Sequence, residues 1–139
     1  MRVFVSGSFD LLHSGHIAFF EEASSYGELY VGIGSDISIE FLKNRSTIYS
    51  QEERLYMVKA IKYVKDANIN SGMGSEDFMY NPFFVFCDIL IVNEDQESEA
   101  KKLLCTTTGK QYMVLKRIPH KGLPSRSSTE MRKYGQRDI

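Results

Sequence analysis

The chain has few of the residues that mark several protein classes. Its 139 residues include no tryptophan, two cysteines, three prolines and three histidines. Cys87 and Cys105 have no metal-ligand spacing and are too few for a disulfide framework, so we expect reduced thiols and a cytoplasmic protein. The net charge of −1 gives no reason to expect nucleic acid or a membrane as a partner. The late apolar run from Phe83 to Val92 contains Asp88 and is too short to span a bilayer.

Short β-branched runs alternate along the chain with longer amphipathic segments, the pattern of an α/β domain. Strands are predicted at Arg2–Ser6, Leu29–Gly34, Ala67–Ile69, Asp88–Val92 and Tyr112–Lys116. Helices are predicted at Gly15–Tyr26, Ser50–Tyr63, Glu97–Thr107 and Ser128–Tyr134. We therefore expect one domain over residues 1–139, built as a Rossmann-like, doubly wound sheet of five parallel strands in the order 3-2-1-4-5. In the segment Gly72–Phe86, Pro82 interrupts any long helix, which leaves a short helix or an irregular aromatic stretch.

In an open parallel sheet, ligands bind beyond the carboxyl ends of the strands, where the strand order reverses. The first predicted strand leads into the segment Gly7–His16, and the fourth leads into Asn93-Glu94-Asp95. With the expected strand order these two loops flank the crevice. The sequence therefore predicts a ligand site between them.

The first of these loops carries two histidines at the start of a predicted helix. His13 and His16 are three residues apart, so both lie on one face of its first turn. Unpaired N–H groups and the helix dipole make that turn a site for anions, which points to phosphate chemistry. Two alternatives stay open, namely zinc binding by Asp10 and the two histidines, and a capped helix start without a ligand. A dinucleotide site is poorly supported, because Gly7 and Gly15 do not form GxGxxG.

The ten residues Gly-Ser-Phe-Asp-Leu-Leu-His-Ser-Gly-His from Gly7 to His16 resemble the HxGH signature of cytidylyltransferase-like nucleotidyltransferases, G-[TSC]-F-D-x-x-H-x-G-H, at every fixed position. The resemblance runs from Val3 to about Lys133 and is nearest to glycerol-3-phosphate cytidylyltransferase and related small cytidylyl- and adenylyltransferases. It implies transfer of a nucleoside monophosphate from a nucleoside triphosphate to a phosphorylated small alcohol, polyol or sugar, with release of pyrophosphate. It also implies Mg²⁺ as cofactor and a homodimer.

The resemblance also implies roles for individual residues. His13 and His16 donate hydrogen bonds to the phosphates, Lys43 reaches them from a mobile loop, and Arg132 or Arg126 adds charge. Contacts to the nucleotide are expected from Gly7, Ser8, Phe9, Asp10, Gly15, Asp95, Arg117, Ser127, Ser128 and Thr129. Arg54 and Lys62 are expected to bind the acceptor. Glycerol-3-phosphate cytidylyltransferases tend to have an arginine where this chain has Lys62, which argues against glycerol 3-phosphate as the acceptor.

Each of these segments also has a simpler interpretation. Lys43 fits a solvated basic loop, Asp95 an exposed acidic loop, and Ser-Ser-Thr-Glu from Ser127 an ordinary helix cap. Arg54 stands at a helix start, where the dipole disfavours it, so a ligand or a buried partner would explain it. The aromatic segment Phe78–Phe86 fits core packing or a dimer contact, and an acceptor pocket is the alternative.

The base of the nucleotide is the least determined feature. The Gly-Ser-Phe-Asp start and the Glu52-Glu53-Arg54 element favour CTP. The Arg117-Ile118-Pro119 segment and the Ser-Ser-Thr tail resemble archaeal FAD synthase, which transfers AMP from ATP. We expect CTP, with ATP as the alternative. A nucleotide-binding module without catalysis and a metal-dependent hydrolase are the remaining classes of function.

Overall fold

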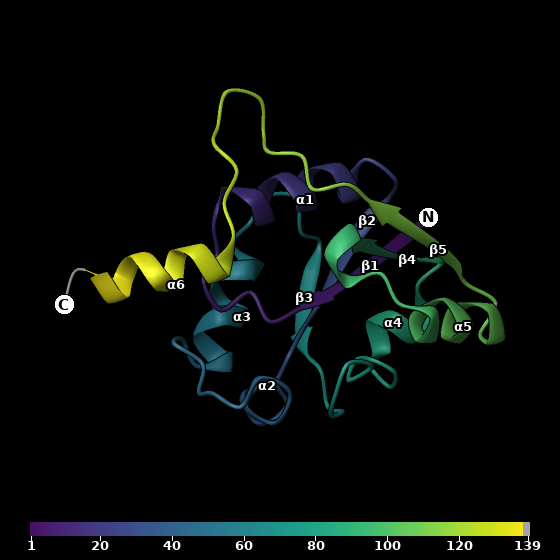
Figure 1. Ribbon diagram of the computed structural model, residues 1–139. Helices are drawn as coiled ribbons and strands as arrows, with labels where there is room; N and C mark the ends of the chain where they lie inside the picture. The colour runs from purple at the N-terminus through teal and green to yellow at the C-terminus, as the bar shows by residue number, and fades with distance from the viewer. Residues whose placement is uncertain (138–139) are drawn as a thin grey trace.

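The computed structural model describes residues 1–137, in which five parallel strands form one sheet between two layers of helices (Figure 1). The strands are β1 (Arg2–Gly7), β2 (Glu28–Ile33), β3 (Asp66–Ile69), β4 (Ile89–Asn93) and β5 (Gln111–Leu115). They lie in the order β3-β2-β1-β4-β5, and all four neighbouring pairs are parallel. The predicted doubly wound α/β fold and its strand order are confirmed.

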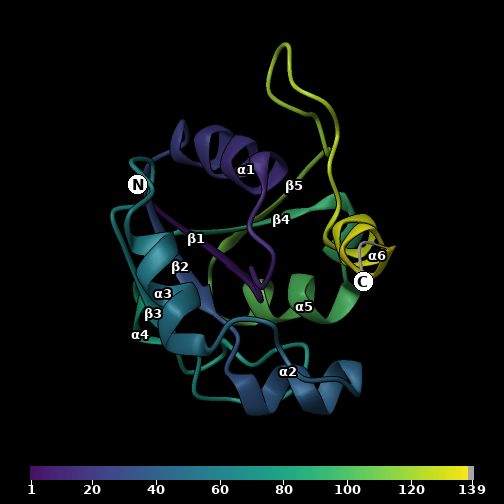
Figure 2. The ribbon, with the colours of Figure 1, turned by 90° about the vertical axis from the view of Figure 1, so that its left-hand side faces the viewer.

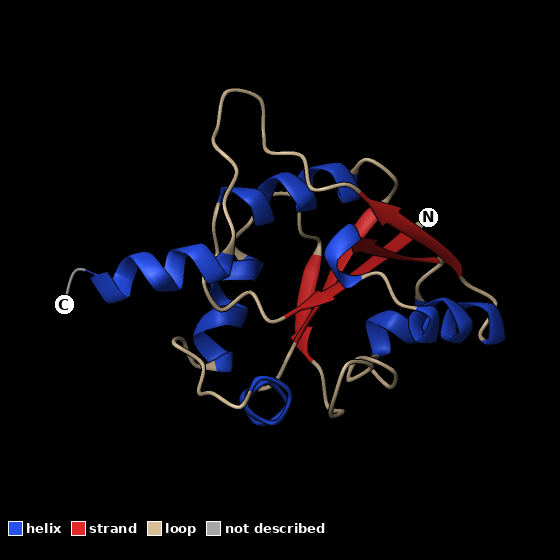
Figure 3. Cartoon of the chain, viewed as in Figure 1, coloured by secondary structure: helices blue, strands red, loops and turns tan. Residues whose placement is uncertain are grey.

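Helices cover both faces of this sheet. They are α1 (Ser14–Ser24), α2 (Asp36–Lys43), α3 (Gln51–Lys59), α4 (Pro82–Phe86), the 3₁₀ turn η1 (Glu94–Gln96), α5 (Glu99–Thr107) and α6 (Ser128–Arg137). Figure 3 shows α1 on one side of the sheet and α4 and α5 on the other. Within residues 1–137, no helix combines the length and the apolar character that crossing a membrane requires.

Two hydrophobic cores follow from the alternation of side chains along β1. Val3 and Val5 point into the core shared with α1 and α3, whereas Phe4 between them points into the core shared with α4 and α5. All three side chains are fully buried. Strands covered on both faces are apolar throughout, which explains the short runs of valine and isoleucine in the sequence.

Helix α2 is an element that the sequence analysis did not predict. The Oγ of Ser35 caps it by accepting a hydrogen bond from the Ser38 amide at 3.2 Å. Ile39 is buried, but Ile37 and Phe41 are 70% and 71% exposed. The alternation of these three apolar residues has the period of a strand and not that of a helix that buries an apolar face. Lys43 is the last residue of α2, and its predicted position in a loop is therefore wrong.

The aromatic segment before β4 contains a short helix, one of the two expected possibilities. Asn81 caps α4, and Pro82 occupies its first turn, where a missing N–H costs nothing. Phe78 and Phe84 are each 1% exposed and belong to the second core. Core packing is therefore the correct interpretation for these two rings.

Candidate active site

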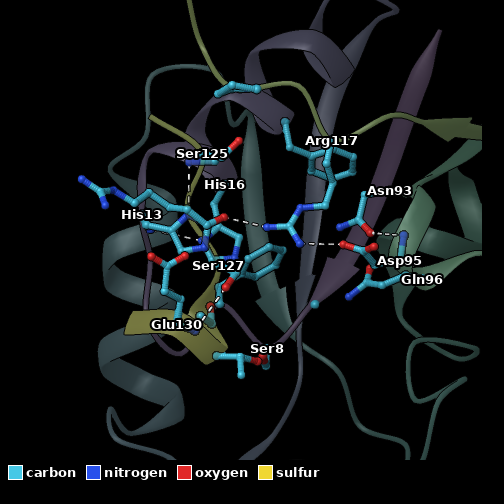
Figure 4. Close-up of a pocket in the computed structure, with 18 of the residues that line it drawn as sticks. Ser8, His13, His16, Asn93, Asp95, Gln96, Arg117, Ser125, Ser127 and Glu130 are labelled. Carbon is cyan, nitrogen blue, oxygen red and sulfur yellow. Dashed lines mark hydrogen bonds and ion pairs between the residues drawn. The ribbon is translucent and has the colours of Figure 1, made fainter. Parts of the chain in front are cut away.

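A cavity of about 520 Å³ opens beyond the carboxyl ends of β1 and β4, at the predicted crevice. Its walls come from the turn between β1 and α1, the end of β4, the segment after β5 and the start of α6. Figure 4 shows His13 and His16 on one side of this cavity and Asp95 on the other, with Arg117 between them. Residues separated by more than a hundred positions in the chain therefore meet at one edge of the sheet.

His13 and His16 cap helix α1 reciprocally. The Gly15 amide donates to Nδ1 of His13, and the His13 amide donates to Nδ1 of His16, each at 3.1 Å. The two rings stack with their centroids 3.9 Å apart. Because each Nδ1 accepts a hydrogen bond, each neutral ring carries its proton on Nε2.

The surroundings of both histidines favour the neutral ring. Burial lowers the pKa of His16 to about 3, and the neighbouring His13 and Arg117 act in the same direction. Burial also lowers the pKa of His13, together with the charges of Arg117 and Arg126. At physiological pH the pair therefore offers N–H donors and has no proton to give as an acid.

The two glycines of the motif leave room for the rings beside them. A Cβ on Gly15 would lie 2.9 Å from Cε1 of His13, and a Cβ on Gly7 would lie 2.8 Å from Cζ of Phe9. Phe9 has a φ of 51°, in the left-handed region, and its ring meets His16 edge to face. Gly7 and Gly15 thus line the cavity, as predicted, and they also allow the aromatic packing that fixes both histidines.

Arg117 connects two walls of the cavity. Its Nη1 lies 2.7 Å from Oδ2 of Asp95, and its Nη2 donates to the backbone oxygen of Arg126 at 2.6 Å. Asp95 itself lies in η1, where its amide donates to Oδ1 of Asn93. The structure therefore joins Asp95 and Arg117, which the sequence analysis had named separately, as one ion pair in the cavity wall.

The start of α6 forms the side of the cavity opposite the β1–α1 turn. Ser127 caps this helix, since its Oγ accepts from the Glu130 amide at 3.1 Å. The Oγ of Ser128 donates to the backbone oxygen of Leu11 at 3.4 Å, and Ser127, Ser128 and Thr129 all line the cavity. A second helix N-terminus thus faces the same space as that of α1, as the phosphate-site hypothesis requires.

Asp10 and Arg132 do not line the cavity, contrary to the direct contacts expected from them. The carboxylate of Asp10 is buried and accepts from the Ile48 amide at 2.9 Å, the Tyr49 amide at 2.9 Å and Nη2 of Arg132 at 2.8 Å. Burial alone would raise the pKa of Asp10, but these hydrogen bonds outweigh it and hold the pKa below its usual value. Asp10 is therefore a charged structural anchor beside the site.

The two residues expected to bind the acceptor lie elsewhere. Arg54 is fully buried and donates to the backbone oxygens of Ser8 and Gly34 and to Asp36, so the buried partner, and not a ligand, explains its position. Lys62 lines a separate shallow hollow beside the start of β2. The structure supports neither residue as a contact to a ligand in the main cavity.

Some lining residues were missed by the sequence analysis. They are Glu22, Gln96, Lys116, Ile118, Pro119, Ser125 and Glu130, together with the flanking Ser6, Phe19 and Asn93. The signal for Lys116 was available, because it is basic and adjoins Arg117. Arg126, expected as the alternative to Arg132 as a source of charge, lines the cavity, whereas Arg132 does not. Within residues 1–137, no cluster of three histidine, cysteine, aspartate or glutamate side chains is arranged to hold a metal ion. The zinc alternative for Asp10, His13 and His16 therefore has no geometric support.

Comparisons with known proteins agree with this geometry. Residues 4–134 match the family described as Cytidylyltransferase-like. FAD synthase from Methanohalophilus mahii is 38% identical over 104 residues, which cover 73% of this chain and 69% of the relative. FAD synthase from Aciduliprofundum boonei is 31% identical over 143 residues, covering 100% and 83%. The structure of a lipopolysaccharide core biosynthesis protein from Thermoplasma volcanium superposes with a TM-score of 0.69 at 25% identity, covering 86% and 98%.

Proposed function

We propose that this chain, which belongs to the cytidylyltransferase-like family of nucleotidyltransferases, transfers AMP from ATP to the phosphate of FMN and releases pyrophosphate. Relatives that match most of the chain are FAD synthases, which favours ATP over the CTP expected from the sequence. The Glu52-Glu53-Arg54 element carries no information about the base, because Arg54 is buried away from the cavity. Its agreement with cytidylyltransferases therefore reflects shared architecture.

The reciprocal cap of His13 and His16 is the observation that carries the proposal. It leaves two neutral Nε2–H donors beside the N-terminus of α1, in a cavity that the N-terminus of α6 also faces. Uncharged donors held in fixed positions stabilise charge that develops on a phosphoryl group without themselves changing protonation state. This arrangement supports a nucleotidyltransferase better than a metal-dependent hydrolase.

In the proposed reaction a phosphate oxygen of FMN attacks the α-phosphorus of ATP. A new P–O–P bridge forms between FMN and the α-phosphorus. The bond from the α-phosphorus to the oxygen that joins it to the β-phosphorus of ATP breaks, and pyrophosphate leaves with that oxygen and the electron pair of the bond. A phosphate monoester with a second pKa of about 6 is largely ionised at neutral pH, so the nucleophile needs no general base. We assign the α-phosphate to the two histidines and the β- and γ-phosphates to Ser127, Ser128 and Thr129.

Positive charge for the triphosphate would come from four cavity residues outside the HxGH motif. They are Lys43, Lys116, Arg117 and Arg126. Each comes from a segment after β2 or after β5, so the fold brings them to the histidines from a distance in sequence. Catalysis of this type depends mainly on such positioning and on charge stabilisation.

Magnesium is compatible with this cavity when it arrives with the nucleotide. Mg²⁺ in such sites is usually held by one or two carboxylates together with substrate phosphates and water. Glu130 is a carboxylate in the cavity lining beside Ser128 and Thr129, and it would hold such an ion together with the triphosphate. When bound, the ion would neutralise charge on the leaving pyrophosphate.

A phosphorylated sugar is the second candidate acceptor. The solved lipopolysaccharide core biosynthesis protein resembles this chain over 86% of its length. A segment of the bifunctional protein HldE from Aliarcobacter butzleri is also 42% identical over 64 residues, although this is only 13% of that protein. The FAD synthases cover more of the chain, so FMN is the first choice. A homodimer stays a prediction.

The test is a matrix of two nucleotides and two acceptors with Mg²⁺. Purified protein is incubated with ATP or CTP, and with FMN or a heptose phosphate, while pyrophosphate release is followed and the product is identified by mass spectrometry. We expect FAD and pyrophosphate from ATP and FMN only. His16→Gln is the matched control, because it keeps the cap acceptor but should lower the rate by about 10²–10³. Pyrophosphate release only with CTP, or only with the sugar phosphate, would refute the assignment.

A further inference from the structure

The start of helix α6 is tied to the domain by hydrogen bonds of its side chains. Figure 1 shows its far end projecting away from the sheet, and Figure 2 views the same helix nearly along its axis. None of residues 128–133 belongs to either hydrophobic core. The contacts that hold it are the hydrogen bonds from Ser128 to Leu11, from Arg117 to the Arg126 backbone, and from Arg132 to Asp10.

Asp10 is the fixed end of the last of these contacts. Its side chain is 1% exposed and is held by the amides of Ile48 and Tyr49, while Arg45 approaches it at 4.0 Å. Arg132, on the second turn of α6, has a side chain that is 17% exposed and places Nη2 2.8 Å from Oδ2 of Asp10. Among the side chains of residues 1–133, this is the one ion pair between α6 and the sheet domain.

We propose that Asp10 and Arg132 form a latch that sets the position of α6, so that Ser127, Ser128 and Thr129 face the histidine pair across the cavity. The inference rests on the proposed function in one respect, since it takes the cavity to be the triphosphate site. Both latch residues are positioning residues, because neither lines the cavity. They act through the helix that carries the phosphate donors.

The ion pair of Asp10 and Arg132 favours the closed position of α6 by an amount that still allows the helix to open. A hydrogen bond between charged, largely desolvated groups changes a population by about ten- to a hundredfold. The buried Nε of Arg132 has no hydrogen-bond partner in residues 1–137, and this unmade bond reduces the net gain. If only closed α6 binds the triphosphate tightly, the apparent dissociation constant rises by the factor by which the closed population falls.

The test compares Asp10→Asn, Arg132→Gln and the double variant with Lys133→Gln, which changes an exposed cation next to the latch. Binding of ATP with Mg²⁺ is measured by calorimetry, and hydrogen exchange of the amides of residues 126–133 is measured without nucleotide. We expect each single variant to weaken ATP binding about tenfold or more and to speed exchange at α6. The double variant should bind ATP no more weakly than the single variant with the lower affinity, because the two substitutions remove the same contact. Lys133→Gln should match the parent protein in ATP affinity and in exchange.

The kinetic readout separates positioning from general destabilisation. Saturating ATP would itself hold α6 closed, so the latch variants should raise KM for ATP and keep kcat within about threefold. Asn at position 10 retains an oxygen for the amides of Ile48 and Tyr49. If Asp10→Asn does not fold, Arg132→Gln against Lys133→Gln carries the test.

Two results would overturn the latch. In the first, Arg132→Gln weakens ATP binding without changing exchange at α6, which would make Arg132 a direct phosphate ligand. In the second, Arg132→Gln changes neither the affinity for ATP nor the hydrogen exchange at α6. The proposed function is judged separately, because exchange and ATP binding need no acceptor and no turnover. A protein that binds ATP through the latch and makes no FAD would refute the function and leave the latch intact.

Discussion

Acidification should destabilise this protein through His16 in particular. The pKa of His16 is about 3 in the folded protein, against about 6.5 in the unfolded chain. A histidine whose folded pKa is lowered contributes stability above its unfolded pKa, and that stability is lost as the pH falls from 6.5 toward the folded pKa. The unfolded state takes up the proton first, which draws the equilibrium toward it.

The size of this effect follows from the two pKa values. At pH 4 the unfolded histidine is almost fully protonated, whereas the folded one is mostly neutral. The gap of 2.5 pH units between 6.5 and 4, at about 1.4 kcal/mol per unit, corresponds to a loss of about 3 kcal/mol between pH 7 and pH 4. Any folded pKa below 4 gives nearly the same figure, because the pH of the measurement then sets the limit.

His16→Gln isolates this contribution. Glutamine at the third helical position can accept the hydrogen bond from the His13 amide, as in an ordinary capping box, but it does not titrate. Urea unfolding of both proteins at several pH values gives two curves of free energy of unfolding. The parent protein should lose about 3 kcal/mol more than the variant between pH 7 and pH 4. Groups present in both proteins, such as Asp10, cancel, and parallel curves would refute the neutral, buried histidine.

Three further changes test the surroundings of the site. Gly15→Ala places a Cβ 2.9 Å from His13, so turnover should fall by about 10²–10³ with a loss of only about 1 kcal/mol of stability; full turnover would contradict the packing argument. Arg54→Met removes the donor of three backbone oxygens, those of Ser8, Gly34 and Tyr49, and the charged partner of Asp36, so it should cost about 3 kcal/mol in urea unfolding; a cost under about 1 kcal/mol would mean that these groups find other partners without Arg54. Burial raises the pKa of Cys87 to about 11, so a thiol reagent at pH 8 should modify it only after denaturant is added, and rapid reaction of the native protein would be the opposite result.

Local sequence signals predicted most of the fold because they match the way this chain is stabilised. Ser50, the first residue of the second predicted helix, caps α3, and Gly109 has a left-handed φ of 72° just after α5, so residues that favour helix ends stand at these ends. The apolar strand runs were recognisable because both faces of the sheet are covered. Helix α2 escaped prediction because its apolar residues Ile37, Ile39 and Phe41 alternate at the period of a strand, and only Ile39 among them is buried.

The sequence predicted the part of the site that one contiguous motif forms. It misjudged the residues whose role depends on contacts with distant parts of the chain. His13 and His16 cap one helix turn, so their spacing contained the geometry. Arg54 and Arg132 resemble ligand-binding arginines in sequence, yet each is paired with an aspartate, Asp36 and Asp10 respectively. A sequence shows that a cation is present, but the choice between a ligand and a carboxylate partner depends on the tertiary fold.

The neutrality of the histidine pair determines where the remaining charge must come from. A nucleoside triphosphate brings several negative charges, and the HxGH turn meets them with N–H donors and a helix dipole alone. Lys116, Arg117 and Arg126 all lie in the segment between β5 and α6, and Arg117 joins that segment to Asp95. Three of the four cations proposed for the triphosphate are therefore attached to the part of the chain that leads into α6, and the fourth, Lys43, comes from the end of α2. Movement of α6 would shift the Arg126 backbone that Arg117 binds, so the position of this helix should control both the phosphate donors and the charge around them.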